Sequence, residues 1–361
     1  MASRFFSSRR ELRPLLDGVL VVELASVLAG PSAGQFLAEL GATVVKVENT
    51  TTRGDVTRTW RLPSERGKRG SVGGSGSDGT GAGTESNNGI DGGIRDDMTA
   101  RNRGGESEGD SGRSDDSVTA YFSACNMGKQ SVAIDLRDAS GLNACHRLLR
   151  SADVVLASYK PGDAERLGVD YATARALNPA VVYAQITGYG VDDDRAGYDA
   201  VIQAESGFQY MNGLDAPTKM PVAMMDLLAS HQIKEGVLAG LLRRAMGGGD
   251  DDDRTTCGSL VSVSLLGAGV SALANQGTGY LREGVVPQRM GNDHPVICPY
   301  GTIFECADGG LITLAVGSDA QWRGLCGVLQ MPDDERFSTN PLRVEHRGAC
   351  KEAVQEKIAA F

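Results

Sequence analysis

The sequence has few aromatic side chains, no long apolar run and no cysteine pattern. Phe, Trp and Tyr make up 5% of the 361 residues. No stretch approaches the ~18 consecutive apolar residues of a membrane-spanning helix, which excludes such a helix. The seven cysteines include no Cys-x-x-Cys pair and no metal-ligand spacing. We therefore expect reduced thiols in a reducing compartment, with neither a disulfide framework nor a metal site.

Positive charge is also in deficit. The chain has 36 Lys and Arg against 46 Asp and Glu, which gives a formal net charge of −10. This balance argues against a nucleic-acid surface, and neither nucleic acid nor membrane is an expected partner. The length allows two domains or one large one, and it is sufficient to bury a sizeable core.

Glycine, by contrast, is abundant and unevenly placed. Of the 48 glycines, 15 lie in residues 64–117, together with many Ser and Asp and almost no large apolar side chains. Such a segment cannot bury enough apolar area to offset its ordering entropy, so we predict a disordered insert there. The tract GGGDDDDR at 247–254 is predicted to be a short low-complexity loop of the same kind.

The N-terminal residues 1–14 are rich in Arg and Ser and contain a single acid, Glu11. This composition suits a mitochondrial presequence, and the alternative is an ordinary basic tail on a cytoplasmic protein.

Elsewhere, apolar strand-like runs alternate with helical runs. Such alternation predicts an α/β fold with a doubly wound parallel sheet, a Rossmann-like large domain. A hairpin over 302–306 and 309–316, followed by a helix over 344–360, indicates a smaller α+β domain. The expected strands of the large domain are 19–24, 43–47, 131–136, 153–157 and 181–186, and its helices are 33–40, 141–151, 171–177 and 227–245.

The first strand–turn–helix segment imitates a dinucleotide-binding unit, with Glu48 at the position of the ribose ligand. However, its turn reads AGPSAG and lacks the G-x-G-x-x-G pattern, and Pro31 removes a backbone N–H that a pyrophosphate would need. We interpret it as a tight strand-to-helix turn that requires small residues.

Several collinear segments together resemble the class III (CaiB/BaiF-type) CoA-transferases. The AGYDA segment at 196–200 and the HPVICPYG segment at 294–301 are most similar to the mitochondrial enzymes that pass CoA from succinyl-CoA to glutarate or hydroxymethylglutarate. The residues that carry the resemblance are LAGPSAGQFLAELGATVVKVE (28–48), GDVTRTW (54–60), NMGKQSVAIDL (126–136), the segment 152–190, AGYDAVIQAESG (196–207), PVAMMDLLASHQIKEGVLAGLL (221–242), SLVSVSLL (259–266) and GNDHPVICPYGTIF (291–304).

The resemblance implies an enzyme in which one Asp carboxylate attacks the thioester of an acyl-CoA. CoA and acyl-CoA are then substrates, and no metal or tightly bound cofactor is needed. The matching residue is Asp226. From the residues alone two interpretations are open for it, an N-cap of the helix that follows or a partly buried functional carboxylate, and both can hold together. A helix N-terminus would also stabilise the carboxylate.

The resemblance further implies a set of CoA contacts, mostly at the ends of predicted strands. Arg137, Lys160, Arg166 and Arg195 are the candidate phosphate ligands, and each has the alternative of a solvated surface charge. The whole implied set is Leu28, Ala29, Ile134, Asp135, Leu136, Arg137, Ser158, Tyr159, Lys160, Arg166 and Arg195.

The chain departs from the family pattern at three positions. Asn49 replaces a basic residue, Ser158 replaces an Asn, and Tyr198 stands where the 2-methylacyl-CoA racemases of the family carry a His. A racemase needs a general base there, so Tyr198 favours transfer over racemisation. His294 is a weak candidate for a substrate contact, and its alternative is a loop histidine bonded to the backbone. A non-catalytic CoA-binding protein is the remaining alternative.

The expected domain organisation places residues 15–63 and 118–285 in the large CoA-binding domain and 286–361 in the small one. In the resembled family two chains interlock as a homodimer and each returns to the large domain at its C-terminus. This chain ends before such a return, so we expect the small domain to be incomplete and the C-terminus truncated.

Overall fold

The computed structural model describes residues 13–66, 118–247 and 258–360. Most of the expected presequence (1–14), insert (64–117) and low-complexity loop (247–254) lies outside these residues. The three insert residues that are described, 64–66, belong to a short helix, α2 (Pro63–Arg66). The described residues form a six-stranded sheet and a two-stranded sheet.

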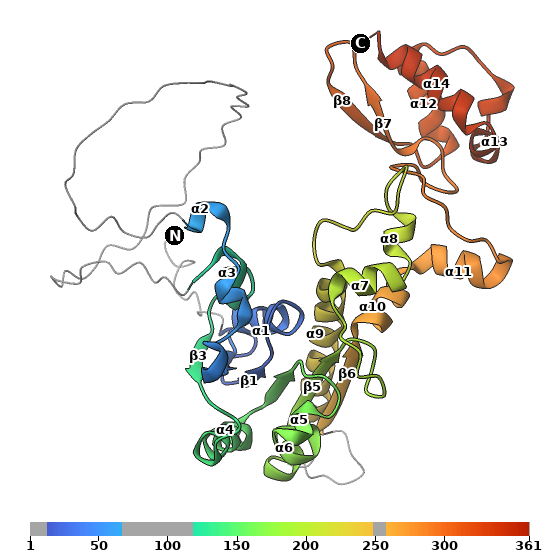
Figure 1. The fold of residues 1–361 in the computed structure, drawn as a ribbon. Coiled ribbons are helices and arrows are strands. Elements are labelled where there is room, and N and C mark those ends of the chain that lie inside the picture. The colour runs from blue at the N-terminus through green and yellow to red at the C-terminus, as the bar shows by residue number, and fades with distance from the viewer. Residues whose placement is uncertain (1–12, 67–117, 248–257, 361) are drawn as a thin grey trace, which may run out of the picture.

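The six-stranded sheet is parallel throughout, in the order β3-β2-β1-β4-β5-β6. The chain starts at the middle of the sheet, proceeds to one edge, and then crosses over to build the other half (Figure 1). The order therefore reverses between β1 and β4, which is where open α/β sheets bind ligands. The strands are β1 (Leu20–Leu24), β2 (Thr43–Glu48), β3 (Gln130–Ala133), β4 (Val154–Ala157), β5 (Val182–Thr187) and β6 (Ser259–Ser264).

Helices cover both faces of this sheet, so its central strands are buried and apolar. One face packs against α1 (Ala29–Glu39), α7 (Asp199–Glu205), α9 (Met224–Ala245) and α10 (Leu265–Ala272). The other packs against α4 (Ala139–Ser151) and α6 (Tyr171–Leu177). Shorter elements are η1 (Thr50–Thr52), η2 (Val56–Thr59), α3 (Ala120–Asn126), α5 (Asp163–Arg166) and α8 (Phe208–Met211).

The predicted parallel α/β sheet is confirmed, and most predicted strands and helices lie within two residues of the observed ones. Several expectations need correction. The strand expected over 131–136 ends at Ala133, because the chain leaves the sheet after the N–H of Ile134 bonds to the carbonyl of Glu48. Strand β6 and helix α10 were not predicted as elements, because the apolar run 259–266 continues without a break from one into the other. Only the side chain of Ser264, which accepts from the N–H of Gly267, marks the change.

The turn after β1 needs small residues, as expected. Helix α1 begins at Ala29, earlier than the predicted 33, and Pro31 is tolerated in its first turn because the missing N–H has no helical partner there. A Cβ at Gly30 would meet the Cβ of Ala25, and one at Gly34 would meet the carboxylate of Glu23. These two glycines let the helix lie close against β1.

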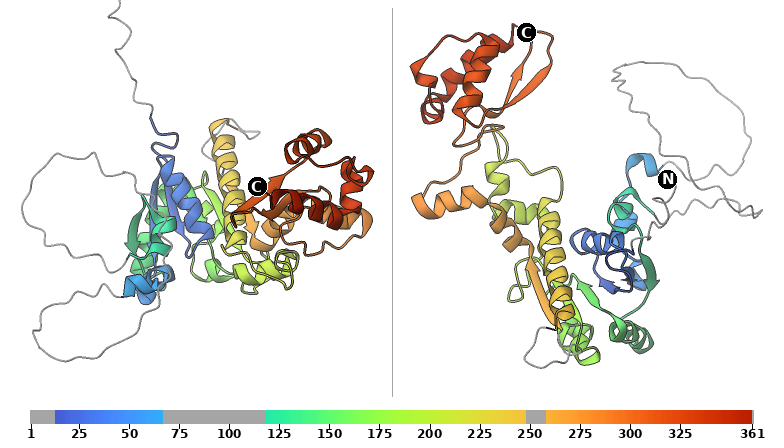
Figure 2. Two further views of the ribbon diagram at one scale, coloured as in Figure 1. Left: turned by 90° about the horizontal axis from the view of Figure 1, so that it is seen from above. Right: turned by 180° about the vertical axis from the view of Figure 1, so that it is seen from behind.

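A second, smaller unit follows α11 (Ala274–Glu283) and is set apart from the sheet in all views (Figures 1 and 2). It contains the antiparallel hairpin β7 (Tyr300–Glu305) and β8 (Leu311–Ala315), as predicted, with α12 (Asp319–Leu329) and η4 (Glu335–Phe337). The single helix expected over 344–360 is wrong: α13 (Asn340–Glu345) and α14 (Arg347–Ile358) are separated at His346. The unit has its own core, which includes Trp322 and Phe337.

Candidate active site

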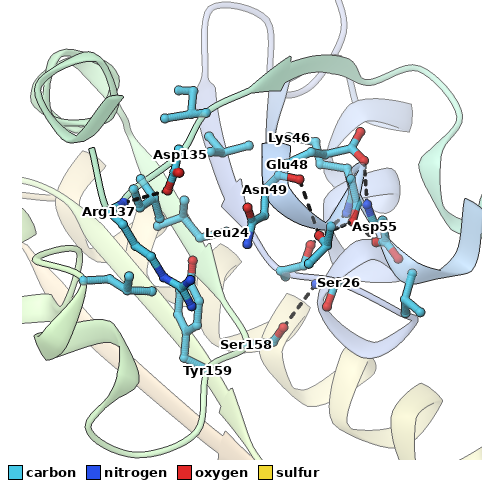
Figure 3. A pocket seen from close by; sticks show the side chains of 18 of the residues that line it. Leu24, Ser26, Lys46, Glu48, Asn49, Asp55, Asp135, Arg137, Ser158 and Tyr159 are labelled. Atoms are coloured by element: carbon cyan, nitrogen blue, oxygen red, sulfur yellow. Dashed lines mark hydrogen bonds and ion pairs between the residues drawn. The ribbon is translucent and has the colours of Figure 1, made fainter. Parts of the chain in front are cut away.

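A cavity of about 450 Å³ opens at the carboxyl ends of β1, β2 and β4, beside the reversal in strand order (Figure 3). We call it the strand-end pocket. It contains most of the predicted contacts that follow β3 and β4, namely Ile134, Asp135, Leu136, Arg137, Ser158 and Tyr159. Its other lining residues come from the ends of β1 and β2 and from η1 and η2: Leu24, Ala25, Ser26, Lys46, Val47, Glu48, Asn49, Thr52, Gly54, Asp55, Val56, Thr59, together with Leu167.

Three of the predicted residues give this pocket an apolar wall and one exposed cation. Burial raises the pKa of Tyr159 to about 12, so its ring lines the pocket as a neutral phenol. Ser158 Oγ accepts the N–H of Ser26 at 3.2 Å and ties the wall at β4 to the turn after β1. Arg137 is exposed and forms no ion pair with another described residue, which leaves its guanidinium available to an anion.

A group of buried charges lies at the inner side of the strand-end pocket, which two of them, Lys46 and Asp55, line. Lys46 Nζ lies 2.8 Å from Glu23 Oε1 and 2.9 Å from Asp55 Oδ2, and Lys129 Nζ lies 2.7 Å from Glu23 Oε2. All four side chains are almost completely buried. Burial opposes the charge on Lys46, but Glu23 and Asp55 outweigh it and raise its pKa. We call Glu23, Lys46, Asp55 and Lys129 the buried ion cluster.

Glu48, the acid of the dinucleotide-like segment, is already saturated with partners. Arg58 contacts both of its oxygens at 2.6 and 2.8 Å, Ser131 Oγ donates at 2.6 Å, and the N–H of Asp55 donates at 2.8 Å. Burial would raise the pKa of Glu48, but these hydrogen bonds lower it to about 2. Its carboxylate is therefore a structural anchor for η2, in agreement with our rejection of the dinucleotide interpretation.

Asp226 lies in the first turn of α9, a helix that packs against α1, and it is half-buried. Burial, together with the negative charge of Asp199, raises its pKa to about 7. The expected stabilisation of the carboxylate by the helix N-terminus is thus outweighed. The N-cap interpretation is also wrong, because the N-cap position is Ala223 and Asp226 is already helical.

Asp199 supplies the cap instead, from α7. Its Oδ1 accepts the N–H of Met225 at 2.7 Å, and its Oδ2 accepts from Gln203 Nε2 at 2.6 Å. Gln203 is fully buried and also holds the preceding loop, through the N–H of Met220 at 2.7 Å and the carbonyl of Val222 at 3.2 Å. The start of α9, and with it Asp226, is fixed by this pair.

Tyr121, from α3, faces the same region. Burial raises its pKa, and the charge of Asp226 is the next cause, which places the phenol near that carboxylate. Its ring packs edge-on against Trp60 at 5.0 Å between centroids. Asp199, Gln203 and Tyr121 were missed by the sequence reasoning. The signal for Asp199 was its place beside Tyr198 in the AGYDA segment, whereas Tyr121 lies in a short helix without an evident pattern.

The remaining predicted contacts lie apart from the strand-end pocket. Leu28 and Ala29 lie at the start of α1, in the turn that ends at the pocket wall. Lys160 is exposed beside a smaller cavity of about 90 Å³ on the far side of Tyr159. Arg166 pairs with Asp163 at 2.9 Å, and Arg195 pairs with Asp193 and lies over the ring of Tyr189.

Tyr198 and His294 do not approach the strand-end pocket's lining. Tyr198 is 71% exposed at the residue before α7. His294 belongs to the smaller unit, where its Nδ1 accepts the N–H of Val296 at 3.2 Å and its ring packs edge-on against Tyr300. In the described ranges no three His, Cys, Asp or Glu side chains gather as a metal site would require, and no helix there is long and apolar enough to cross a membrane.

The profile of CoA-transferase family III matches residues 16–75 and 103–361. The chain belongs to this family. Succinate–glutarate CoA-transferase of Agrobacterium fabrum is 36% identical over 350 residues, which cover 95% of this chain and 74% of the relative. Human succinyl-CoA:glutarate CoA-transferase is 29% identical over 360 residues, 98% of this chain and 68% of the relative. Other relatives are named for oxalate or mesaconate.

The fold agrees with this membership. A solved CAIB/BAIF family protein from Brucella suis superposes with a TM-score of 0.69 at 33% identity, over 96% of this chain and 78% of that protein. CoA-transferases of this family take CoA thioesters as substrates and hold no tightly bound cofactor. The resemblance drawn from the sequence motifs is therefore confirmed for family, fold and enzyme class.

The raised pKa of Asp226 predicts a stability cost in the folded transferase. Because the folded pKa of about 7 lies above the ordinary value of 3.8, stability falls as pH rises between these values and stays lowered above them. Asp226→Asn removes the charge but keeps the shape. We expect its melting temperature to exceed that of the wild type by about 2–4 °C at pH 8 and by less at pH 5. Thermal melts at both pH values measure this difference, and a lower melting temperature for the variant at pH 8 would contradict the assignment of a burial-raised pKa.

Proposed function

We propose that this transferase moves CoA from an acyl-CoA donor, succinyl-CoA, to a dicarboxylic acid such as glutarate. The observation that carries the proposal is the half-buried carboxylate of Asp226, held at the start of α9 in a chain of CoA-transferase family III. The names of the relatives from Agrobacterium and human support this pair of substrates. Other relatives are named for oxalate and mesaconate, so the acceptor acid is the least constrained part of the proposal.

The proposed chemistry begins at Asp226. Its carboxylate attacks the thioester carbonyl carbon, a mixed anhydride forms, and CoA leaves as the thiolate. The thiolate attacks the aspartyl carbonyl, which releases succinate and leaves an aspartyl-CoA thioester. Glutarate then attacks this thioester to form a second anhydride, and the returning thiolate yields glutaryl-CoA and restores the carboxylate. The sequence divides one hard exchange into easier steps and consumes no proton overall.

The surroundings of Asp226 support this role. Low hydration protects a mixed anhydride from water, and burial is the first cause of the raised pKa. A carboxylate with a pKa of about 7 is also more basic than an ordinary one, which favours nucleophilic attack once it is ionised. Asp199 and Gln203 keep the group in place while it forms and breaks covalent bonds.

We assign CoA to the strand-end pocket and its rim. Tyr159 and the apolar residues after β3 suit the adenine, and Arg137 suits a phosphate. Lys160 and Arg166, beyond Tyr159, and Arg195, beside α7, are further candidates for the phosphates, whereas Leu28 and Ala29 stand where the pantetheine would pass toward Asp226. Tyr198 and His294 are kept as candidate substrate contacts. The exposed Tyr198, with no carboxylate hydrogen-bonded to it among the described residues, suits transfer better than racemisation.

We also propose a homodimer, a mitochondrial location and the two-domain division given above. Exposed apolar residues follow one another from α11 into the connection to the smaller unit, Leu281 at 83% and Val285 at 62%, which suits a surface covered by a second chain. Light scattering at micromolar concentration measures the mass in solution. The location rests on the composition of residues 1–14 alone.

Incubation of the purified protein with succinyl-CoA and a panel of dicarboxylic acids tests the function directly. We expect new CoA thioesters, glutaryl-CoA among them, by mass spectrometry. Asp226→Asn should reduce transfer by at least about a thousandfold, because the nucleophile is lost, while CoA still binds. Absence of transfer to every acid by a folded preparation overturns the proposal. Exchange of the α-proton of bound acyl-CoA in deuterated water, without an acceptor, would instead indicate racemisation.

The pH dependence of transfer should report the ionisation of Asp226. Because the nucleophile must be ionised, we expect kcat/KM to fall about tenfold per pH unit below pH 7. Asp199→Asn removes the neighbouring negative charge, so the pKa of Asp226 falls and this limb moves to lower pH. Asp334→Asn, which removes a partly exposed carboxylate paired with Arg336 in the smaller unit, is the control and should leave the profile unchanged. If the fall of kcat/KM stays at the same pH in Asp199→Asn, the pH profile does not report the ionisation of Asp226 beside Asp199.

Loss of the cation at the strand-end pocket should weaken acyl-CoA binding. We expect Arg137→Ala to raise the KM for acyl-CoA about tenfold, the value of one charged hydrogen bond to phosphate, with a smaller change in kcat. Arg336→Ala removes an exposed arginine of the smaller unit and serves as the matched control. Equal KM values in both variants would place the phosphates elsewhere.

A further inference from the structure

The turn between β1 and α1 contains a strained residue. Val27 has a φ of 71°, in the left-handed region that a β-branched side chain rarely adopts. Residues 25–28 form this turn and helix α1 begins at Ala29; Ala25 and Ser26 line the strand-end pocket. Such a conformation persists only where the surrounding structure holds it.

The buried ion cluster holds the turn at three backbone groups. Lys46 Nζ donates to the carbonyl of Ala25 at 2.8 Å, and Lys129 Nζ donates to the carbonyl of Pro31 at 2.8 Å. Between them, the N–H of Val27 donates to both carboxylate oxygens of Asp55 at 3.2 and 3.3 Å. The cluster therefore contacts the start of the turn, its strained residue and the first turn of α1.

Stability alone does not explain this cluster. Two cations and two anions have been removed from water, and ion pairs of this kind are commonly no more stabilising than apolar side chains of similar volume. Apolar replacements, however, could not donate to two carbonyls or accept from the N–H of Val27. The cluster is neutral as a whole, and its members come from β1, β2, the residue before η2 and the residue before β3.

We propose that the buried ion cluster is a positioning device for the substrate pocket: Asp55, backed by Lys46, holds Val27 in its left-handed conformation and so sets the wall formed by Ala25 and Ser26. Lys46 and Asp55 are positioning residues that act on CoA through this turn. The inference rests on the proposed assignment of CoA to the strand-end pocket.

A double-mutant cycle between Asp55 and Val27 tests the proposal. Asp55→Asn weakens the hold on Val27, and we expect the Kd for CoA, measured by calorimetry, to rise about tenfold. Val27→Gly alone should change the Kd less than about twofold, because glycine adopts this conformation without strain. In the double variant the glycine no longer needs to be held, so the Kd should return to within about threefold of the wild type.

The Asp153–Arg244 ion pair, 2.7 Å long at the opposite end of β4, provides the matched control. Asp153→Asn should lower the melting temperature and leave the Kd for CoA unchanged. Hydrogen exchange of the 25–31 segment without ligand should be faster in Asp55→Asn and unaltered in Asp153→Asn. If Asp55→Asn does not fold, Cys125→Ala takes its place. This variant removes a weaker contact, from Sγ to the carbonyl of Val27 at 3.3 Å, and we expect it to accelerate the same hydrogen exchange.

The outcomes separate this inference from the function on which it rests. A wild type that does not bind CoA, or an Arg137→Ala variant that binds it equally well, overturns the pocket assignment and the inference with it. A wild type that binds CoA, together with a double variant no better than Asp55→Asn, overturns the inference alone. If Asp153→Asn raises the Kd for CoA as much as Asp55→Asn does, the effect of Asp55 is one of general stability, and the inference is again overturned.

Discussion

The carboxylate of Asp226 is held where its charge is disfavoured, and the rest of the site is arranged around that constraint. Burial and the second carboxylate of Asp199 both oppose ionisation, and together they raise the pKa of Asp226 to about 7. A group held against its own solvation needs a rigid support, or it would move toward water. The support is the hydrogen-bonded set of Asp199, Gln203 and the N-terminus of α9. The burial that makes Asp226 costly in the folded state is also what, in the proposed reaction, makes its carboxylate a stronger nucleophile.

In the proposed function, the strand-end pocket must recognise an anionic substrate although the chain as a whole is acidic. The lining cation Lys46 is paired with the buried acids Glu23 and Asp55, and the nearby Arg58 is paired with the lining residue Glu48. Arg137 at the rim is therefore the lining cation without an ion pair among the described residues. The inner charges thus pair with one another, and in the proposed function the rim charge of Arg137 meets the ligand. Helix α1 packs against both α9 and α3, so the turn that begins it links the pocket to the region of Asp226.

Much of the fold was predictable from the sequence, because parallel strands that are buried on both faces consist of short runs of Val, Ile and Leu. The runs around Val21, Val44 and Val155 predicted their strands closely. Prediction failed where one apolar run served two elements, as in β6 and α10. For the candidate site, Ser158 and Tyr159 directly follow β4 and Arg137 lies a short way beyond β3, so the predicted strand ends made them candidates at the sheet edge. Asp199 acts on Met225, 26 residues away, through a tertiary hydrogen bond that no local pattern records.

The buried ion cluster was, in retrospect, visible in the sequence. Glu23 and Lys46 each interrupt an apolar strand run, and both are almost completely buried. A charge in such a run must find a partner on an adjacent strand, and the register of the sheet places Glu23 directly opposite Lys46. Two opposite charges in neighbouring buried strands therefore predict their own pairing. What they hold, the carbonyl of Ala25 and, through Asp55, the N–H of Val27, follows only from the path of the turn in three dimensions.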